Sequence, residues 1–206
     1  MEARSANRNM LRIGVTGGIG AGKSTVCRVF EILGIPVFYA DEESKQLLSD
    51  PIVKLEVIKL LGVNVYTDGN ADRKKIAHIV FNNKEILKSF NAIMHPTVSR
   101  RFNSWLDKQH DVPYVIKEAA LIFETGLEKD LNKIIIVAAP MDLRIRRIQS
   151  RDGITEEQAL LRMQNQWPQE EKIKLSDFLI DNNDEQPIIP QILSLHEELT
   201  ELAQVL

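Results

Sequence analysis

Eight consecutive residues, from Gly17 to Ser24, have the composition of a loop that holds phosphate groups. They read Gly-Gly-Ile-Gly-Ala-Gly-Lys-Ser and fit the pattern G-x-x-x-x-G-K-[ST]. Glycines let successive backbone N–H groups point at one anion, and the helix expected to begin near Lys23 adds its positive dipole end. Lys23 would bring a charge to the β- and γ-phosphates, and the Ser24 hydroxyl could ligate Mg²⁺. These residues predict binding of a nucleoside triphosphate, with ATP as the first candidate, together with Mg²⁺.

The segments on either side of this loop are those that a P-loop requires. Leu11–Thr16 is mostly apolar and predicts a short strand, and Ser24–Leu33 has apolar residues at helical spacing. The alternative is a glycine-rich strand–helix turn that binds nothing. We favour the phosphate loop because all the fixed positions of the pattern occur between a strand and a helix, which predicts the P-loop NTPase fold.

The composition is that of one globular domain without a membrane segment. The chain has 206 residues, of which 44% are hydrophobic and 27% are charged, and its formal net charge is −3. Such a charge argues against a nucleic-acid or membrane surface as partner, and no apolar run approaches the roughly 18 residues of a membrane helix. Cys27 is the single cysteine, so we expect no disulfide framework and a cytoplasmic location. Residues 1–9 are polar and predict a loose tail.

Four further apolar runs predict strands that follow the first one. They are Pro36–Tyr39, Tyr114–Ile116, Ile134–Ala138 and Phe178–Ile180. Buried-type strands separated by helices indicate a five-stranded parallel sheet with helices on both faces. We expect this α/β core to occupy about residues 10–41 and 112–206.

A long helical region, about residues 42–109, lies between the second and third predicted strands. Asp50-Pro51 and the segment Thr67–Asn70 punctuate it, and Pro96 predicts a helix start near that residue. A crossover between two strands needs far less helix than this. We therefore expect a helical substrate-binding insertion.

A second special region runs from Asp142 to Lys174. It contains a capping-box sequence, Thr155–Gln158, and five arginines, which are Arg144, Arg146, Arg147, Arg151 and Arg162. One interpretation makes these arginines a solvated basic face, and we expect that of about half of them. The other makes residues 147–172 a helical lid whose arginines close over the nucleotide.

Taken together, the motifs resemble those of the dephospho-CoA kinase family, the kinases that complete coenzyme A synthesis. The segments that carry the resemblance are Thr16–Thr25, Val37–Asp41, Asp72-Arg73, Val80-Phe81, Met94–Pro96, Leu121–Glu124, Arg151–Thr155, Arg162-Met163, Gln166–Pro168, Glu170–Lys172 and Ile180–Asn183. The resemblance implies ATP-dependent phosphorylation of the ribose 3′-hydroxyl of dephospho-CoA. With the charge argument above, we expect an enzyme without nucleic-acid or membrane partners that is a monomer or a weak homo-oligomer.

Four residues depart from the pattern of this family. Tyr39 stands where an Asp is common, Glu118 replaces an Asp, Ala120 replaces a Pro, and Asp184 replaces a Gly. Glu118 keeps the negative charge, so contact with Mg²⁺ or its water shell stays open, whereas Tyr39 weakens the case for two acids in the site.

The resemblance assigns residues to three groups. The catalytic residues would be Asp41, Lys23 and Arg147. The nucleotide-binding residues would be Gly17, Gly18, Ile19, Gly20, Ala21, Gly22, Lys23, Ser24 and Thr25, with Arg151 and Asn182, and Ser24 would be the Mg²⁺ ligand. The acceptor side would consist of Asp41, Arg73, His95, Glu118 and Arg162.

Each of the less specific assignments has an alternative that the sequence leaves open. Asp41 is either the base for the 3′-hydroxyl or the N-cap of a helix starting at Glu42. Glu118 is either an acid of the phosphate site or a solvated acid at a strand end. His95 either orients the chain at a helix start or contacts the acceptor. Arg73 either holds a pyrophosphate or is a surface arginine. Arg162 either closes over the substrate or locks the lid helix.

Two other functions are compatible with a P-loop alone. One is phosphorylation of another small molecule, such as a nucleoside, a nucleotide or a shikimate-like acid, and the ordered set of motifs argues against it. The other is a regulatory switch that hydrolyses nucleotide. A guanine-binding switch would carry N-K-x-D after a strand, and Asn182–Glu185 lacks the lysine.

Overall fold

The computed structural model describes residues 10–205, except for the side chain of Phe81, so the predicted tail of residues 1–9 lies outside the described residues. The chain folds into two compact units. The first unit runs up to Phe38 and resumes at Gln109, and the second unit is Tyr39–Lys108.

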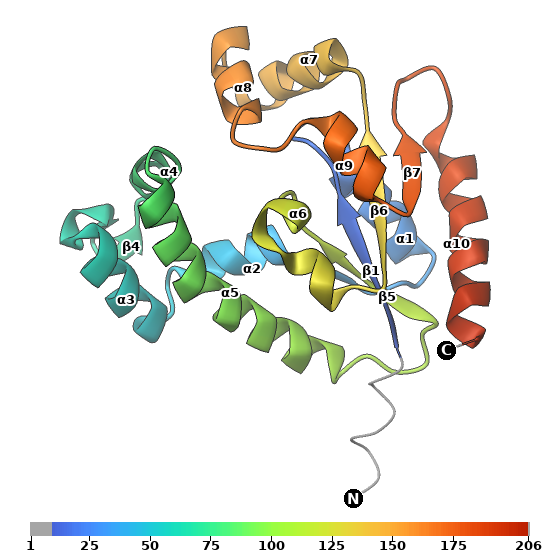
Figure 1. Cartoon of the computed structure of the whole chain (residues 1–206), viewed down its shortest axis with the longest axis horizontal. Coiled ribbons are helices and arrows are strands. Elements are labelled where there is room, and N and C mark those ends of the chain that lie inside the picture. Colours follow the sequence, from blue (N-terminus) through green and yellow to red (C-terminus); the bar gives the residue numbers. More distant parts are fainter. Residues whose placement is uncertain (1–9, 206) are drawn as a thin grey trace, which may run out of the picture. The chain divides into compact units, whose positions relative to one another are not determined.

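A five-stranded parallel sheet forms the first unit's core (Figure 1). Its strands are β1 (Leu11–Thr16), β2 (Val37–Tyr39), β5 (Tyr114–Glu118), β6 (Lys133–Ala138) and β7 (Phe178–Asp181). Their order across the sheet is β2-β5-β1-β6-β7, so β1 is the central strand. The five strands and the parallel α/β architecture expected from the apolar runs are confirmed.

Helices cover both faces of this sheet because its strands are mostly apolar and buried; Ile13, Ile116 and Ile135 have no exposed surface. The helices are α1 (Lys23–Ile32), α6 (Ile122–Thr125), the 3₁₀ turn η3 (Leu127–Asp130), α7 (Met141–Asp152), α8 (Glu156–Met163), α9 (Gln169–Leu175) and α10 (Ile188–Gln204). Helices α1 and α10 pack against each other and against β5, while α6 and α9 lie over the other face (Figure 1).

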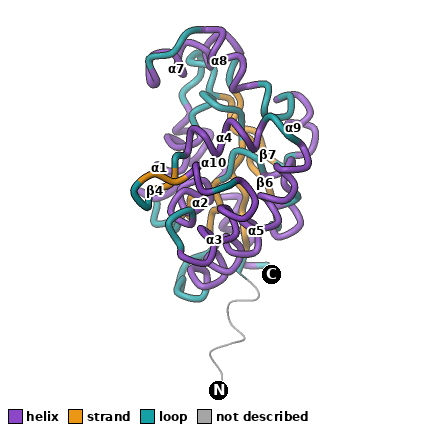
Figure 2. The backbone as a smooth tube through the Cα atoms, turned by 90° about the vertical axis from the view of Figure 1, so that its left-hand side faces the viewer, coloured by secondary structure: helices purple, strands orange, loops and turns teal. Residues whose placement is uncertain are grey.

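Helices α7 and α8 pack side by side, as both views show (Figure 1, Figure 2). The capping box predicted between them is present: Thr155 accepts a hydrogen bond from the backbone of Gln158, and the Gln158 side chain accepts one from the backbone of Thr155. Ala159 is buried in a small cluster with Ile148, and Ile154 packs on that cluster. This cluster packs α8 against α7.

The second unit is mainly helical and is organised around one long helix, α5 (Lys84–Leu106). Its other elements are α2 (Ala40–Leu47), α3 (Pro51–Leu61), η2 (Val63–Val65), β3 (Tyr66–Thr67), β4 (Asn70–Ala71) and α4 (Arg73–Phe81). Asp50 caps α3 by accepting from the N–H groups of Ile52 and Val53, as the Asp-Pro pair suggests. The predicted break at Thr67–Asn70 is the turn of a short antiparallel hairpin, orange beside the label β4 in Figure 2.

The prediction of a helix start near Pro96 is wrong. Pro96 lies inside α5, which begins well before it, after the N-cap Asn83. A proline in a helix interior removes one backbone hydrogen bond and costs about 3 kcal/mol in an isolated helix. Here Met94, Val98 and Phe102 are buried on one side of α5, and this packing holds the helix through the proline.

Candidate active site

The phosphate loop connects the end of the central strand β1 to the start of α1. Its shape requires glycine at two positions in particular. Gly17 has a φ of 148°, and a Cβ there would lie 2.3 Å from the carbonyl oxygen of Val137. Gly22 has a φ of 97°, and a Cβ there would lie 2.2 Å from Nδ2 of Asn182. The loop therefore packs closely on β6 and on the segment after β7, as a P-loop should.

Lys23 is the first residue of α1, and its ammonium group lies at Gly17, the first residue of the loop. Its Nζ donates to the carbonyl oxygen of Gly17 at 3.0 Å and lies 3.8 Å from Oε1 of Glu118. Glu118 ends β5 opposite Val15 of β1, which brings its carboxylate to the phosphate loop. Glu118 is only 6% exposed, so the interpretation of a solvated acid at a strand end is wrong.

Ser24 and Thr25 follow Lys23 on the first turn of α1, and both are exposed. A helix N-terminus offers N–H groups and a positive dipole to an anion, so this turn fits phosphate oxygens. Within residues 10–205, no group of three or more His, Cys, Asp and Glu side chains could hold a metal ion. The hydroxyl of Ser24 and the carboxylate of Glu118 are the candidate protein oxygens for a Mg²⁺ ion that accompanies the phosphates.

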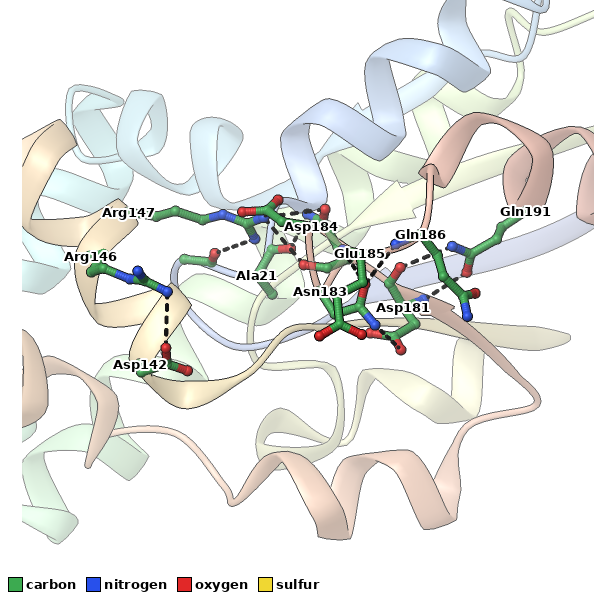
Figure 3. Close-up of polar contacts among 12 residues, drawn as sticks. Ala21, Asp142, Arg146, Arg147, Asp181, Asn183, Asp184, Glu185, Gln186 and Gln191 are labelled. Atoms are coloured by element: carbon green, nitrogen blue, oxygen red, sulfur yellow. Dashed lines mark hydrogen bonds and ion pairs between the residues drawn. The ribbon is translucent and has the colours of Figure 1, made fainter.

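Arg147 of α7 lies against the outer side of the phosphate loop, and Figure 3 shows its contacts. Its guanidinium donates to the carbonyl oxygens of Gly20 at 3.5 Å and of Asn182 at 3.2 Å, and to Oδ1 of Asp184 at 2.5 Å. The Asn182 side chain in turn donates to the carbonyl oxygen of Ala21 at 2.8 Å. The structure thus brings two predicted site residues, Arg147 and Asn182, to the phosphate loop.

Arg144 contacts the loop as well, although no individual role was predicted for it from the sequence. Its Nε donates to the carbonyl oxygen of Ile19 at 3.0 Å, and its guanidinium lies where a side chain on Gly18 would be. Arg144 is 7% exposed, and this burial lowers the pKa of its guanidinium, partly offset by Glu170. The sequence does contain one signal that Arg144 faces inward, because it lies one helical turn before the apolar Ile148, which is buried on α7.

The expected lid is tied to the phosphate loop at Ile19. The Ile19 N–H donates to Oε1 of Gln166, in the segment between α8 and α9, at 2.8 Å. The Ile19 side chain packs against the cluster of Ile145, Ile148 and Ala159 on α7 and α8. The loop and the lid region are therefore in direct contact.

A buried ion pair between Lys172 and Glu124 connects the C-terminal end of the lid region to α6. Nζ of Lys172 lies 2.5 Å from Oε1 of Glu124 and donates to the carbonyl oxygen of Ala120 at 2.9 Å. The same carboxylate oxygen of Glu124 accepts from the N–H of Trp167 at 2.9 Å. Burial lowers the pKa of Lys172, and the contact with Glu124 offsets only part of this shift. Glu124 of α6 thus contacts both Trp167, which precedes α9, and Lys172, which lies in α9.

The two exposed lid arginines pair with a carboxylate at the end of α7. Arg151 donates to Asp152 at 2.7 Å, and Arg162 of α8 donates to Asp152 at 2.5 Å. The hydrogen bond from Arg151 lowers the pKa of Asp152. This arrangement supports the interpretation that Arg162 locks the lid helix, and it places neither arginine on the phosphate loop.

The remaining predicted residues lie in the second unit. Asp41 is exposed in the first turn of α2, whose N-cap is Tyr39, so the interpretation of Asp41 as N-cap is wrong. Arg73 is exposed at the first position of α4, after the N-cap Asp72. His95 lies in the interior of α5, so it does not orient the chain at a helix start.

The geometry is that of a P-loop phosphotransferase, and comparison with known proteins gives the family. The family model for dephospho-CoA kinase matches residues 11–187. The chain belongs to the dephospho-CoA kinase family. The match ends just before α10, so it includes the phosphate loop, the second unit and the segment of Asn182.

Individual dephospho-CoA kinases support the same assignment. The one from Bacteroides fragilis is 36% identical over 186 residues, which are 90% of this chain and 91% of that protein. The one from Chlorobaculum tepidum is 41% identical over 181 residues, which are 84% and 86% of the two chains. The solved structure of the dephospho-CoA kinase from Campylobacter jejuni superimposes with a TM-score of 0.64 at 29% identity and covers 92% of this chain and 97% of its own.

From residue 10 to residue 205, no helix is both long and apolar enough to cross a membrane.

Proposed function

We propose that this chain transfers the γ-phosphoryl group of ATP to the 3′-hydroxyl of the ribose of dephospho-CoA, which yields coenzyme A and ADP. The observation that carries the proposal is the phosphate loop, with Lys23 between the carbonyl oxygen of Gly17 and the buried carboxylate of Glu118, in a chain of the dephospho-CoA kinase family.

The phosphate loop and α1 provide most of the charge stabilisation. Phosphoryl transfer has a loose transition state, so positioning and charge neutralisation contribute more than covalent chemistry. The backbone N–H groups of Gly17–Thr25 bind the triphosphate, and Lys23 exchanges its carbonyl contact for the β- and γ-phosphate oxygens. Bound Mg²⁺ would neutralise charge on those oxygens, with Ser24 as its protein ligand and Glu118 beside it. Arg147 and Asn182 border the nucleotide from α7 and from the end of β7.

The second unit, together with a short flanking segment, is proposed to bind dephospho-CoA. The corresponding insertion is about residues 42–109. Its proposed acceptor residues are Arg73 and His95, and the proposed acceptor residue Asp41 directly precedes it. Asp41 accepts the proton of the 3′-hydroxyl as the phosphoryl group arrives. A base adds less to a loose transition state than positioning does, so some activity should survive its replacement.

The lid, about residues 147–172, is proposed to exclude water from the γ-phosphate. Arg151 is assigned to the nucleotide and Arg162 to the acceptor. Both arginines pair with Asp152, so each would bind its ligand while it keeps or weakens that ion pair. We further propose a cytoplasmic enzyme that is a monomer or a weak homo-oligomer; the single cysteine, Cys27, is buried and free, as suits a reducing compartment.

A coupled assay of ADP release, run with four acceptors, tests this function. The purified chain is given Mg²⁺-ATP with dephospho-CoA, with a nucleoside, with shikimate, or with water alone. Release with dephospho-CoA should exceed that with each other acceptor by orders of magnitude. Equal release with water alone would identify a hydrolase, and preference for a nucleoside or shikimate would identify a different small-molecule kinase.

A further inference from the structure

The loop that follows β7 places a carboxylate directly on Arg147. Oδ1 of Asp184 lies 2.5 Å from Nη2 of Arg147, with the two side chains 62% and 27% exposed (Figure 3). Asp184 has a φ of 65°, a left-handed conformation that few residues other than glycine, asparagine and aspartate adopt readily. The backbone of this loop therefore presents the carboxylate to the arginine at some conformational cost.

The other contacts of Arg147 among the described residues are neutral. Its guanidinium donates to the backbone oxygens of Gly20 and Asn182 and, at 3.4 Å, to Oδ1 of Asn182. These three acceptors can hold the guanidinium in place without neutralising its charge. Asp184 supplies a charge of opposite sign to the same group, so the two functions, holding and neutralising, are carried by different partners.

The position of Asp184 is fixed by contacts that do not involve Arg147. Oδ1 of Asn183 accepts from the N–H groups of Glu185 and Gln186, at 2.8 and 3.0 Å. Nδ2 of Asn183 donates to the carboxylate of Asp181, and Gln191 of α10 bonds to the backbone N–H and carbonyl of Asp181. Figure 3 shows these bonds around the turn. A substitution of Asp184 that keeps its shape should leave the loop intact.

We propose that Asp184 is a positioning residue that lowers nucleotide affinity by competing with the phosphates for the charge of Arg147. The inference rests on the proposed function in one respect, namely that Arg147 serves the bound nucleotide. A phosphate oxygen can gain the full attraction of the guanidinium only by weakening its ion pair with Asp184. Neutralising the carboxylate therefore strengthens binding, and the gain grows with the number of phosphates on the ligand.

The test is the affinity of Asp184→Asn for adenosine, ADP and Mg²⁺-ATP, measured by displacement of a fluorescent ATP analogue without any acceptor. Asparagine keeps the shape and tolerates the left-handed backbone, and thermal unfolding confirms that the variant is folded. An exposed ion pair is worth up to about 1 kcal/mol, so we expect ATP to bind about threefold to fivefold more tightly and adenosine to bind unchanged.

Asp142→Asn is the matched control. Asp142 pairs with Arg146 on the same helix, at 3.0 Å, and these side chains are 72% and 69% exposed (Figure 3). This variant removes the same charge without touching Arg147, so its ATP affinity should equal that of the native chain. An equal gain in both variants would mean that net charge alone explains the effect, which would overturn the proposal.

The double variant Arg147→Ala/Asp184→Asn isolates the pair. If Asp184 acts through Arg147, the gain from Asp184→Asn disappears once the arginine is absent. A gain that persists without Arg147, an equal gain for adenosine, or no gain for ATP would each overturn the inference. Failure of the proposed function looks different, because it would appear in the acceptor assay as ADP release that does not depend on dephospho-CoA, whereas these affinities are measured without any acceptor.

Discussion

Ile19 is the residue at which the phosphate loop is held from three directions. Gln166 binds its N–H, Arg144 binds its carbonyl oxygen, and its side chain packs into the cluster of α7 and α8. A loop fixed in this way presents its N–H groups without having to reorganise when the phosphates arrive. Such preorganisation is a major source of electrostatic stabilisation in enzymes.

Replacing Arg144 by alanine should therefore raise the KM for ATP by about tenfold or more, because a buried charged hydrogen bond contributes roughly 1.5–3 kcal/mol. Steady-state kinetics at saturating dephospho-CoA measures this. Arg146→Ala is the control, since Arg146 lies on the same helix and pairs with the exposed Asp142. An unchanged KM in Arg144→Ala would contradict the role given to Arg144.

At the residue scale, the sequence could predict the phosphate loop and, through the family resemblance, Arg147, but it could not predict that Arg144 reaches the loop and Arg151 does not. The loop is a local motif whose chemistry follows from adjacent residues. The cluster of arginines is local too, but Arg147 pairs with Asn182 and Asp184, which are distant from it in the sequence. Arg151 and Arg162 instead meet Asp152, at the end of their own helical corner. Burial of Glu118 likewise depends on the neighbouring strand.

Among the elements, α6 and α9 are joined by the pair of Glu124 and Lys172. The Lys172 side chain has no exposed surface and that of Glu124 is 11% exposed. Both charges are removed from water, so each depends on the other and on the added contacts to Ala120 and Trp167.

Glu124→Ala should destabilise the chain strongly, by about 3–5 kcal/mol, because it leaves the ammonium group of Lys172 buried without its carboxylate. Chemical denaturation followed by circular dichroism measures the change. Glu171→Ala removes the exposed partner of Lys174 on the same helix and should have an effect below about 1 kcal/mol. Equal effects of the two substitutions would show that the pair at Lys172 has no special weight.

Elements with a strong apolar pattern could be predicted, and those without one could not. The five strands of the sheet and the capping box of α8 are examples of local patterns that the tertiary structure preserves. The hairpin of β3 and β4 has only two residues in each strand, which is too short for any periodicity. Pro96 is a local signal for a helix start that packing along α5 overrides.

For the molecule as a whole, a kinase of this kind must keep water away from the γ-phosphate until the acceptor is bound. We therefore predict that an ATP analogue with dephospho-CoA slows amide hydrogen exchange in residues 147–172 and 42–109 more than the analogue alone. Exchange measured by mass spectrometry with no ligand, one ligand and both ligands provides the comparison. Exchange in residues 147–172 that no ligand changes would mean that Arg151 and Arg162 form a solvated face.

The position of the new phosphate on the product tests the central claim most directly. The chain is incubated with Mg²⁺-ATP and dephospho-CoA, and the product is examined by phosphorus NMR and mass spectrometry, with Lys23→Ala as the catalytically impaired control. The native chain should yield a single new phosphomonoester on the ribose 3′-hydroxyl, and Lys23→Ala should remain folded while its turnover falls by orders of magnitude. Phosphate on another group, free phosphate alone, or normal turnover in Lys23→Ala would contradict the account.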